Sequence, residues 1–267
     1  MKTLTVLKLG GSAITDKSKS CTPNLSLIQR VAGHVSRHKG PLILLHGGGS
    51  YAHPVVTKAK LQEGYKGKFQ LQSVSETELY LDQLTRIIGV SLLLQGRAFV
   101  PIRPMSFIML NRGQIAGSFL EPIKSALQLG LTPLIHGDLA FDRAKGYGVV
   151  SADRLASYLG MSLGASRVLF GCDVDGVYSE NPRLSAKAQL VREINKSNAS
   201  SVLRKLSMHR SSDATGGMLG KVKEALRAAK SGREGCIFNL KNEETLRNVL
   251  RGKILQGTRF APWGQNS

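Results

Sequence analysis

The chain has 267 residues, a mass of 28.8 kDa and 42% hydrophobic residues, enough for one large domain or two tightly joined lobes. Its 37 Lys and Arg residues exceed its 18 Asp and Glu residues, which gives a formal net charge of +19. No apolar run approaches the ~18 consecutive residues of a membrane-spanning helix, and the N-terminal segment lacks the form of a signal peptide.

In chain order, strand patterns and helix patterns alternate, which predicts βαβ units and an α/β fold. We expect one open, mainly parallel sheet with helices on both faces. The expected elements are a strand at 4–9, a helix at 24–38, strand 41–46, helix 75–95, strand 98–102, a hairpin at 107–116, helix 121–129, strand 132–136, strand 147–150, helix 152–163, strand 167–170, helix 215–230, strand 236–240, helix 243–250 and strand 254–260. The polar stretch 179–212 is only weakly patterned.

The excess of positive charge is larger than a phosphate-binding site requires. A basic solvated surface accounts for it, and binding of nucleic acid or another anionic surface is the alternative. We find no zinc-finger spacing, aromatic-interleaved basic motif or separate basic tail, so the sequence does not favour nucleic acid as a partner. Cys21, Cys172 and Cys236 are odd in number and lack metal-ligand spacing, which predicts free thiols in a cytoplasmic protein.

The first expected strand ends in the sequence KLGGS at residues 8–12. Glycines let backbone N–H groups approach an anion closely, and a lysine inside an apolar strand needs a partner. Lys17 follows the same loop. Because fixed cations do most of the work in phosphoryl transfer, Lys8 and Lys17 are candidates for holding the transferring group.

The strand at 41–46 also ends in glycines, at Gly47, Gly48 and Gly49. Two glycine-rich strand ends indicate two phosphate cradles that face each other, one for a nucleotide and one for an acceptor. His53 lies one helical turn after the second cradle, so its imidazole N–H can reach an anion held there. His46 and His136 end strands, and we expect them to hydrogen-bond the backbone instead.

A third glycine pair, Gly216 and Gly217, opens the expected helix at 215–230. The free N–H groups and the dipole of that end favour phosphate, and Lys221 lies about one and a half turns further on. Asp173 and Asp175 follow the strand at 167–170, at the strand end where open α/β sheets bind ligands. They are candidates for orienting lysines or contacting a nucleotide and Mg²⁺, with ordinary turn chemistry as the alternative.

The chain resembles the amino acid kinase superfamily through the motifs KLGGS at 8–12, HGGGS at 46–50, DVDGVY at 173–178 and TGGMLGK at 215–221. Within it, the chain is most similar to isopentenyl phosphate kinases of the archaeal type, because of the histidine in GGGSYAHP at 47–54. The resemblance implies the amino acid kinase fold, ATP with Mg²⁺, a homodimer, and phosphorylation of isopentenyl phosphate to isopentenyl diphosphate in an alternative mevalonate route. Dimethylallyl phosphate is a further acceptor on this interpretation.

The resemblance also implies roles for particular residues, within a single domain at 1–267. A lobe at about 1–150 would hold the acceptor phosphate, and a lobe at about 151–267 would hold the nucleotide. The implied catalytic residues are Lys8, Lys17, His53 and Lys221. The implied ATP contacts are Lys8, Gly10, Gly11, Ser12, Gly49, Asp173, Asp175, Gly216 and Lys221. The implied acceptor contacts are Gly47, Gly48, His53, Ala152 and Asp153, and no metal ligand is assigned to the protein.

Two positions depart from the family's pattern. Tyr51-Ala52-His53 stands where Phe-Gly-His is usual, and Ser151-Ala152-Asp153 stands where Ser-Gly-Asp is usual. Each places a methyl group where a glycine backbone would approach the acceptor. Alanine keeps its N–H, so a backbone contact survives wherever its φ is negative.

The chemistry of a phosphate acceptor agrees with these residues. A phosphate monoester, with a second pKa of about 6, is largely ionised at neutral pH and needs cations but no general base. Its branched alkene needs an apolar wall beside His53, expected on the helix at 75–95 through Leu79, Tyr80, Leu84, Ile87 and Ile88. The alternatives are a kinase for fosfomycin or another small phosphonate, with a more polar pocket, a carboxylate kinase, and a nucleic-acid-binding protein on the same scaffold.

Overall fold

The computed structural model describes residues 3–180, 182, 185, 187–208 and 217–264. Eight strands form the central sheet: β1 (Thr5–Leu9), β2 (Leu42–His46), β3 (Phe99–Pro101), β6 (Thr132–His136), β9 (Arg167–Cys172), β10 (Glu193–Ile194), β11 (Glu234–Asn239) and β12 (Thr258–Phe260). Their order is β10-β12-β11-β9-β1-β2-β6-β3, and only the β11–β12 pair is antiparallel. The prediction of an α/β fold with a mainly parallel sheet is confirmed.

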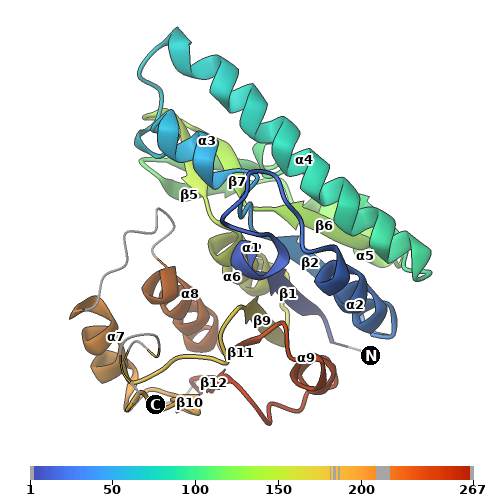
Figure 1. The fold of residues 1–267 in the computed structure, drawn as a ribbon, viewed down its shortest axis with the longest axis vertical. Coiled ribbons are helices and arrows are strands. Elements are labelled where there is room, and N and C mark those ends of the chain that lie inside the picture. The colour runs from blue at the N-terminus through green and yellow to red at the C-terminus, as the bar shows by residue number, and fades with distance from the viewer. Residues whose placement is uncertain (1–2, 181, 183–184, 186, 209–216, 265–267) are drawn as a thin grey trace.

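Helices cover both faces of this sheet (Figure 1). The helices are α1 (Gly11–Ile14), α2 (Leu25–Ser36), α3 (His53–Lys58), α4 (Leu71–Leu94), α5 (Glu121–Gln128), α6 (Ala152–Ser162), α7 (Ala199–Met208), α8 (Gly217–Lys230) and α9 (Glu243–Leu250). Apolar side chains of α5, α6 and α8 pack in one core cluster, and those of α2, α4 and α9 pack in the other. Because β1, β2 and β6 are buried along their whole length, they carry near-continuous apolar runs.

A second sheet of four strands was not expected. It has the order β5-β4-β7-β8 and consists of β4 (Ile108–Asn111), β5 (Gln114–Ser118), β7 (Asp138–Asp142) and β8 (Gly146–Val150). The predicted hairpin is β4–β5, and its turn residues Arg112 and Gly113 have φ of 50° and 73°, as a tight hairpin turn requires. The strand β7 was missed because its apolar run, Leu139 to Phe141, is only three residues long.

Several boundaries differ from the predicted ones. The helix α4 starts at Leu71 and not at Ser75, whose hydroxyl donates to the Leu71 carbonyl at 3.3 Å from inside the helix. The polar stretch at 179–212 contains α7 and β10, and the last strand begins only at Thr258. Residues 215 and 216, expected to open α8, lie outside the described part of the chain.

Two further expectations concern the cysteines and membrane-spanning helices. Cys21, Cys172 and Cys236 are free thiols, as predicted. Within the described residues, no helix is both long enough and apolar enough to span a membrane.

Candidate functional site

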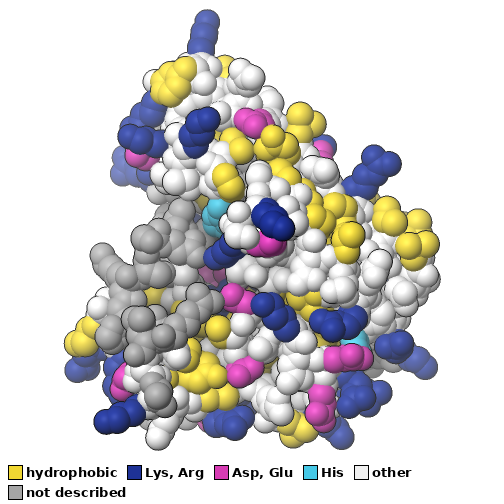
Figure 2. Space-filling view, in the orientation of Figure 1, with side chains coloured by type: hydrophobic (Ala, Val, Ile, Leu, Met, Phe, Trp, Pro, Cys, Tyr) yellow, Lys and Arg dark blue, Asp and Glu magenta, His cyan; other side chains and the backbone are white. Residues whose placement is uncertain are grey.

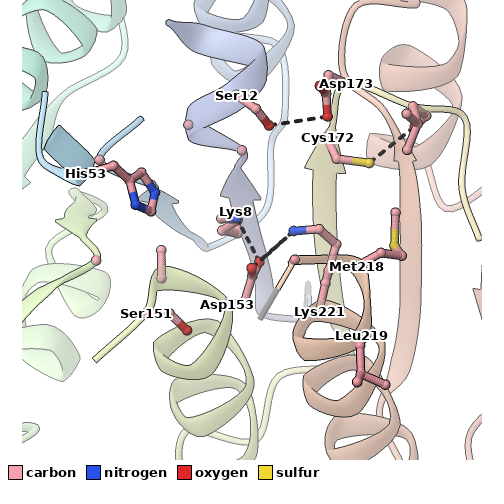
Figure 3. A pocket seen from close by; sticks show the side chains of 18 of the residues that line it. Lys8, Ser12, His53, Ser151, Asp153, Cys172, Asp173, Met218, Leu219 and Lys221 are labelled. Carbon is pink, nitrogen blue, oxygen red and sulfur yellow. Dashed lines mark hydrogen bonds and ion pairs between the residues drawn. The ribbon is translucent and has the colours of Figure 1, made fainter. Parts of the chain in front are cut away.

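A cavity of about 620 Å³ lies where the carboxyl ends of β1, β2, β6 and β9 meet (Figure 3). Parallel strands place their carboxyl ends at one edge, so residues distant in the sequence converge there. The predicted site residues that line the cavity are Lys8, Gly10, Gly11, Ser12, Lys17, Gly47, Gly48, His53, Ala152, Asp153, Asp173 and Lys221.

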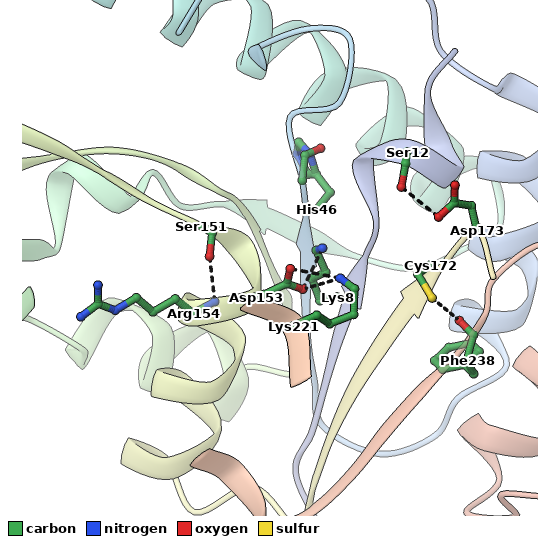
Figure 4. A network of polar contacts seen from close by, with 11 residues as sticks. Lys8, Ser12, His46, Ser151, Asp153, Arg154, Cys172, Asp173, Lys221 and Phe238 are labelled. Atoms are coloured by element: carbon green, nitrogen blue, oxygen red, sulfur yellow. Dashed lines mark hydrogen bonds and ion pairs between the residues drawn. The ribbon is translucent and has the colours of Figure 1, made fainter. Parts of the chain in front are cut away.

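Two buried lysines share one buried carboxylate at the centre of the cavity (Figure 4). The Lys8 ammonium lies 2.8 Å from Asp153 Oδ1, and the Lys221 ammonium donates to both oxygens of Asp153 at 3.1 Å. The three side chains come from β1, from the first turn of α6 and from the second turn of α8. Asp153 was expected to contact the acceptor. It lines the cavity and its oxygens hold the two ammonium groups, so it positions both cations, and its contact with the acceptor stays a prediction.

Burial and charge set the protonation of this cluster. Burial lowers the pKa of Lys8 to about 8, an effect that the Lys221 charge reinforces and Asp153 partly offsets. Burial opposes ionisation of Asp153, but the charges of Lys221 and Lys8 outweigh it and lower its pKa to about 2. For Lys221 the attraction of Asp153 outweighs burial and raises the pKa. With all three groups ionised, the cluster carries one net positive charge for an anionic ligand.

The two glycine loops lie against each other beside this cluster. A Cβ on Gly11 would fall 2.4 Å from the Gly49 nitrogen, and one on Gly10 would fall 2.8 Å from the Gly171 carbonyl oxygen, so side chains do not fit. Gly49 was expected to contact ATP, but it does not line the cavity. Its φ of +51° and the approach of Thr15, 2.1 Å from a built Cβ, show that it shapes the loop.

His53 is the first residue of α3, and its ring points into the cavity from across Lys8 (Figure 3). The cavity wall on this side is mostly apolar and is formed by Ala52, Val56, Leu81, Leu139, Val149 and Val150. The helix α4 does contribute to this wall, as predicted. It does so through Thr77 and Leu81, and none of the five side chains predicted for it lines the cavity.

Two histidines lie beneath the second cradle, at the paired ends of β2 and β6. His46 Nδ1 lies 3.3 Å from the Gly47 carbonyl oxygen, and His46 Nε2 lies 2.8 Å from the Thr85 hydroxyl. The His136 ring packs beside that of His46, with the two ring centroids 5.8 Å apart. Burial lowers the pKa of His46 to about 4 and that of His136 to about 3, so both rings are neutral at physiological pH. The expected backbone contact is found for His46, whose shorter hydrogen bond is to the Thr85 side chain.

The opposite side of the cavity is more polar. The Ser12 hydroxyl donates to Asp173 Oδ1 at 3.2 Å, and Lys17 lies exposed at the rim. The residues on this side that sequence reasoning missed include Tyr178, Ser179, Glu180, Lys205, Leu206 and Leu219. Lys205 and Leu206 belong to α7, a helix that was not predicted, so no sequence signal pointed to them.

Two predicted ATP contacts are not among the described residues that line the cavity, for different reasons. Asp175 lies outside the cavity lining, and its carboxylate accepts hydrogen bonds from the Asn239 amide at 2.9 Å and the Tyr178 hydroxyl at 3.2 Å. Gly216 lies outside the described residues, while Gly217, the first residue of α8, lines the cavity. Among the described residues, no group of three or more His, Cys, Asp or Glu side chains could hold a metal ion.

Both alanines that replace the family's usual glycines fit their positions. Ala52 has φ of −108°, and its methyl group would lie 2.5 Å from a Cβ built on Gly48. Ala152 is the first residue of α6 and packs against Gly137 in the same way, with its Cβ 3.0 Å from a built Cβ. The negative φ of Ala52 meets the condition stated for keeping a backbone N–H contact.

Comparison with known proteins agrees with this geometry. The chain is 30% identical over 263 residues to the isopentenyl phosphate kinase of Methanothermobacter thermautotrophicus, covering 96% of this chain and 98% of that protein. It is 32% identical over 266 residues to the isopentenyl phosphate kinase of Methanocaldococcus jannaschii, covering 96% and 97%. A solved structure of an isopentenyl phosphate kinase superposes with a TM-score of 0.83 at 28% identity, covering 97% of this chain and all of that one.

The chain also matches the model of a protein family. Residues 3–239 match the Amino acid kinase family, and this range includes every strand of the cavity edge and all of the lysine cluster. The chain therefore combines this match with the glycine cradles, the lysines around Asp153 and the parallel strand order. It belongs to the amino acid kinase family.

Proposed function

We propose that this protein transfers the terminal phosphoryl group of ATP to isopentenyl phosphate and so forms isopentenyl diphosphate. The observation that carries the proposal is the position of His53, which faces the lysine cluster across the cavity and adjoins an apolar wall. A phosphate-binding group beside apolar side chains suits an acceptor that is a phosphate on a short hydrocarbon. The isopentenyl phosphate kinases to which the chain is similar support the same substrate.

The residues act mainly by neutralising charge. Two anionic phosphates repel each other when they approach, and the phosphoryl transition state spreads negative charge over its oxygens. Lys8 and Lys221 lie between the two sides of the cavity, so their ammonium groups can contact oxygens of both ligands. Asp153 keeps these two cations close together by accepting from both. No general base is needed, because the acceptor oxygen is already ionised.

The cavity has the groups that ATP requires on its polar side. Backbone N–H groups of Gly10 and Gly11, the Ser12 hydroxyl and Lys221 would hold the phosphates, in keeping with the narrow space around these glycines. Bound MgATP would supply the transferred phosphoryl group. Mg²⁺ often binds through substrate phosphates and one or two carboxylates. We therefore propose Asp173, which lines this side of the cavity, as the carboxylate that would contact it.

The acceptor would occupy the other side. Gly47, Gly48 and His53 would bind its phosphate, and Val56, Leu81 and Val149 would contact its hydrocarbon. These acceptor residues all come from the lobe expected at about 1–150, whereas the ATP side would draw on both expected lobes, through Gly10, Gly11 and Ser12 as well as Asp173 and Lys221. A phosphonate kinase for fosfomycin would need a more polar wall than these side chains offer, so the structure does not favour that alternative.

A panel of acceptors tests the proposal. Purified protein with MgATP is assayed with isopentenyl phosphate, dimethylallyl phosphate, fosfomycin and acetylglutamate, with a Lys8→Met variant as the control for contaminating kinases. We expect the highest kcat/KM with isopentenyl phosphate and a lower value with dimethylallyl phosphate. Higher activity with fosfomycin or acetylglutamate, or none with either prenyl phosphate, would overturn the assignment.

We also infer a homodimer and a cytoplasmic location. The outer face of α4 carries the exposed apolar side chains Leu79, Val90, Leu93 and Leu94. Figure 2 shows yellow side chains along the upper right of the molecule, where α4 runs in Figure 1. A second copy of the chain would bury them, and light scattering with a Leu93→Glu variant tests this, since the variant is expected to be monomeric. The free cysteines suit a reducing compartment.

A further inference from the structure

The proposed function uses few of the molecule's surplus cations. The segments 58–71 and 141–147 form one end of the molecule, beyond the acceptor side of the cavity, and we name this end the basic tip. The Tyr65 backbone N–H donates to the Lys145 carbonyl at 2.8 Å, which joins the two segments. The exposed cations of the basic tip are Lys58, Lys60, Lys66, Lys68, Arg143 and Lys145.

Exposed aromatic side chains lie among these cations. Phe69 is 76% exposed, Phe141 is 52% exposed and Tyr65 is 45% exposed. Tyr147 connects two of them, because its ring centroid lies 6.3 Å from that of Tyr65 and it pairs with Phe141 across β7 and β8. The segment YKGKF at 65–69 is an aromatic-interleaved basic motif, so the expectation that the chain contains none is wrong.

Little negative charge balances the basic tip. Its acidic residues are Glu63, which is exposed, and Asp142, which is buried. The Asp142 carboxylate accepts from four backbone N–H groups, those of Arg112, Gly113, Ala144 and Lys145. Figure 2 shows dark blue and yellow side chains gathered at the top of the molecule, where α4 begins in Figure 1. Cations and apolar rings therefore share one protruding end.

We propose that the basic tip docks on the surface of an anionic lipid bilayer. Lysine side chains can extend their ammonium groups to lipid phosphates while Phe69, Tyr65 and Phe141 enter the interface between headgroups and acyl chains. Each cation near such a surface contributes on the order of fivefold to binding, so six of them supply useful affinity without any deep insertion. This inference does not rest on the proposed kinase activity.

A nucleic acid strand is the competing anionic partner. Proteins that bind single strands place aromatic rings in a positively charged groove, where successive bases stack on them. Here the rings lie on a protruding end, and the edge of one ring of the Tyr65–Tyr147 pair meets the face of the other at an interplanar angle of 69°. This arrangement suits a broad surface better than a strand. Docking of the basic tip on a bilayer would not cover the cavity through Lys66, Lys68 or Phe69, because these residues do not line it.

Vesicle co-sedimentation at low and high salt tests the proposal. The full chain is mixed with vesicles of phosphatidylcholine alone, with vesicles doped with phosphatidylglycerol, and with a single-stranded oligonucleotide. The test variant combines Lys66→Glu, Lys68→Glu and Phe69→Ser. The matched control combines Lys241→Glu, Lys253→Glu and Leu255→Ser, which change the same charge and one exposed apolar side chain at the other end of the molecule.

We expect salt-sensitive binding to the doped vesicles and none to pure phosphatidylcholine. The tip variant should bind about 100-fold more weakly or worse, while the control variant stays within a few-fold of the parent protein. Unfolding midpoints of both variants show whether each is folded. Equal losses in the two variants would mean that only net charge matters, and would overturn the proposal. So would binding to the oligonucleotide without binding to vesicles, or no vesicle binding at low salt.

Discussion

The two sides of the cavity differ although the same sheet edge supports both. On the side of His53, the described lining residues include no acidic side chain and form an apolar wall of Val56, Leu81 and Val149. On the opposite side the lining includes Asp173 and Glu180 together with hydroxyl groups. A small acceptor phosphate with a hydrocarbon tail fits the first surface, and a large polar nucleotide fits the second.

What the two sides share is the cluster of Lys8, Asp153 and Lys221 between them. A substitution in this cluster should therefore impair the handling of both ligands, whereas a substitution on one side should affect one ligand. Whether a variant affects one ligand or both can therefore be used to contradict the predictions below.

The largest effect is expected from Asp153→Asn. The variant leaves two buried ammonium groups without their carboxylate, and breaking such a pair costs about 3–5 kcal/mol of unfolding free energy. Thermal unfolding with and without ATP measures this. Added ATP should raise the midpoint of the variant more than that of the parent protein, because its phosphates replace the lost negative charge.

The control for this experiment is Asp175→Asn, since Asp175 is exposed and lies outside the cavity lining. Its unfolding midpoint and its ATP-induced shift should remain close to those of the parent protein. A loss in Asp175→Asn as large as that in Asp153→Asn would contradict the assignment of Asp153 as the carboxylate that holds both lysines.

The next largest effect is expected from Lys8→Met. Removing one fixed charge that stabilises a transition state costs about 10²- to 10³-fold in kcat. Because Lys8 lies between the two sides, kcat/KM should fall for ATP and for isopentenyl phosphate alike, as steady-state kinetics would report. Lys19→Met, an exposed lysine outside the cavity lining, should leave both values nearly unchanged. A loss confined to one substrate would place Lys8 on one side only.

His53→Ala and Asp173→Asn form a matched pair for the two sides. A hydrogen bond to a charged group contributes about 1.5–3 kcal/mol, which corresponds to about 10- to 100-fold in binding. His53→Ala should raise KM for the acceptor by this amount and leave KM for ATP nearly unchanged. Asp173→Asn should raise KM for ATP and spare the acceptor. If both variants raise both constants equally, the two sides are not independent.

Local patterns in the sequence were sufficient for the centre of this site. An apolar run that ends in glycines identifies a buried strand and its loop, which is why Lys8, Gly11 and Gly47 were expected at the sheet edge where they line the cavity. The partner of the two lysines was harder to find, because Asp153 is 68 residues from Lys221. Sequence patterns predict that a buried lysine needs a partner, but only the packing of α6 beside α8 shows which carboxylate it is.

The errors had a different physical origin. Three consecutive glycines do not reveal which of them turns the chain, so the role of Gly49 follows only from its φ and its neighbour Thr15. The α4 wall was assigned to five large side chains, yet Leu84 and Ile88 are buried in the core and Leu79 is 68% exposed, so Thr77 and Leu81 line the cavity instead. The lysine and aromatic residues of the basic tip are adjacent only after two distant segments pack together.

The pH dependence of the reaction tests the protonation of Lys8 in the cluster of Lys8, Asp153 and Lys221. The pKa of Lys8 is lowered to about 8, so the free enzyme loses this positive charge as the pH rises through that value. We expect kcat/KM for both substrates to fall above about pH 8, by about tenfold per pH unit. Bound phosphates favour charged Lys8, so kcat should hold to a higher pH. A profile of kcat/KM that stays flat to pH 10 would contradict this assignment.

The smallest effect is expected from Ala52→Gly on the acceptor side. The methyl group of Ala52 packs against Gly48 in a backbone conformation with negative φ, so its removal loosens the second cradle without deleting any N–H group. The lost methyl group and the added backbone freedom cost about 1 kcal/mol, which lowers the unfolding midpoint by about 2–4 °C. KM for isopentenyl phosphate should change less than threefold, well below the effect of His53→Ala. A large rise in KM would mean that the methyl group itself contacts the acceptor, and the apolar wall would then extend to the edge of the phosphate cradle.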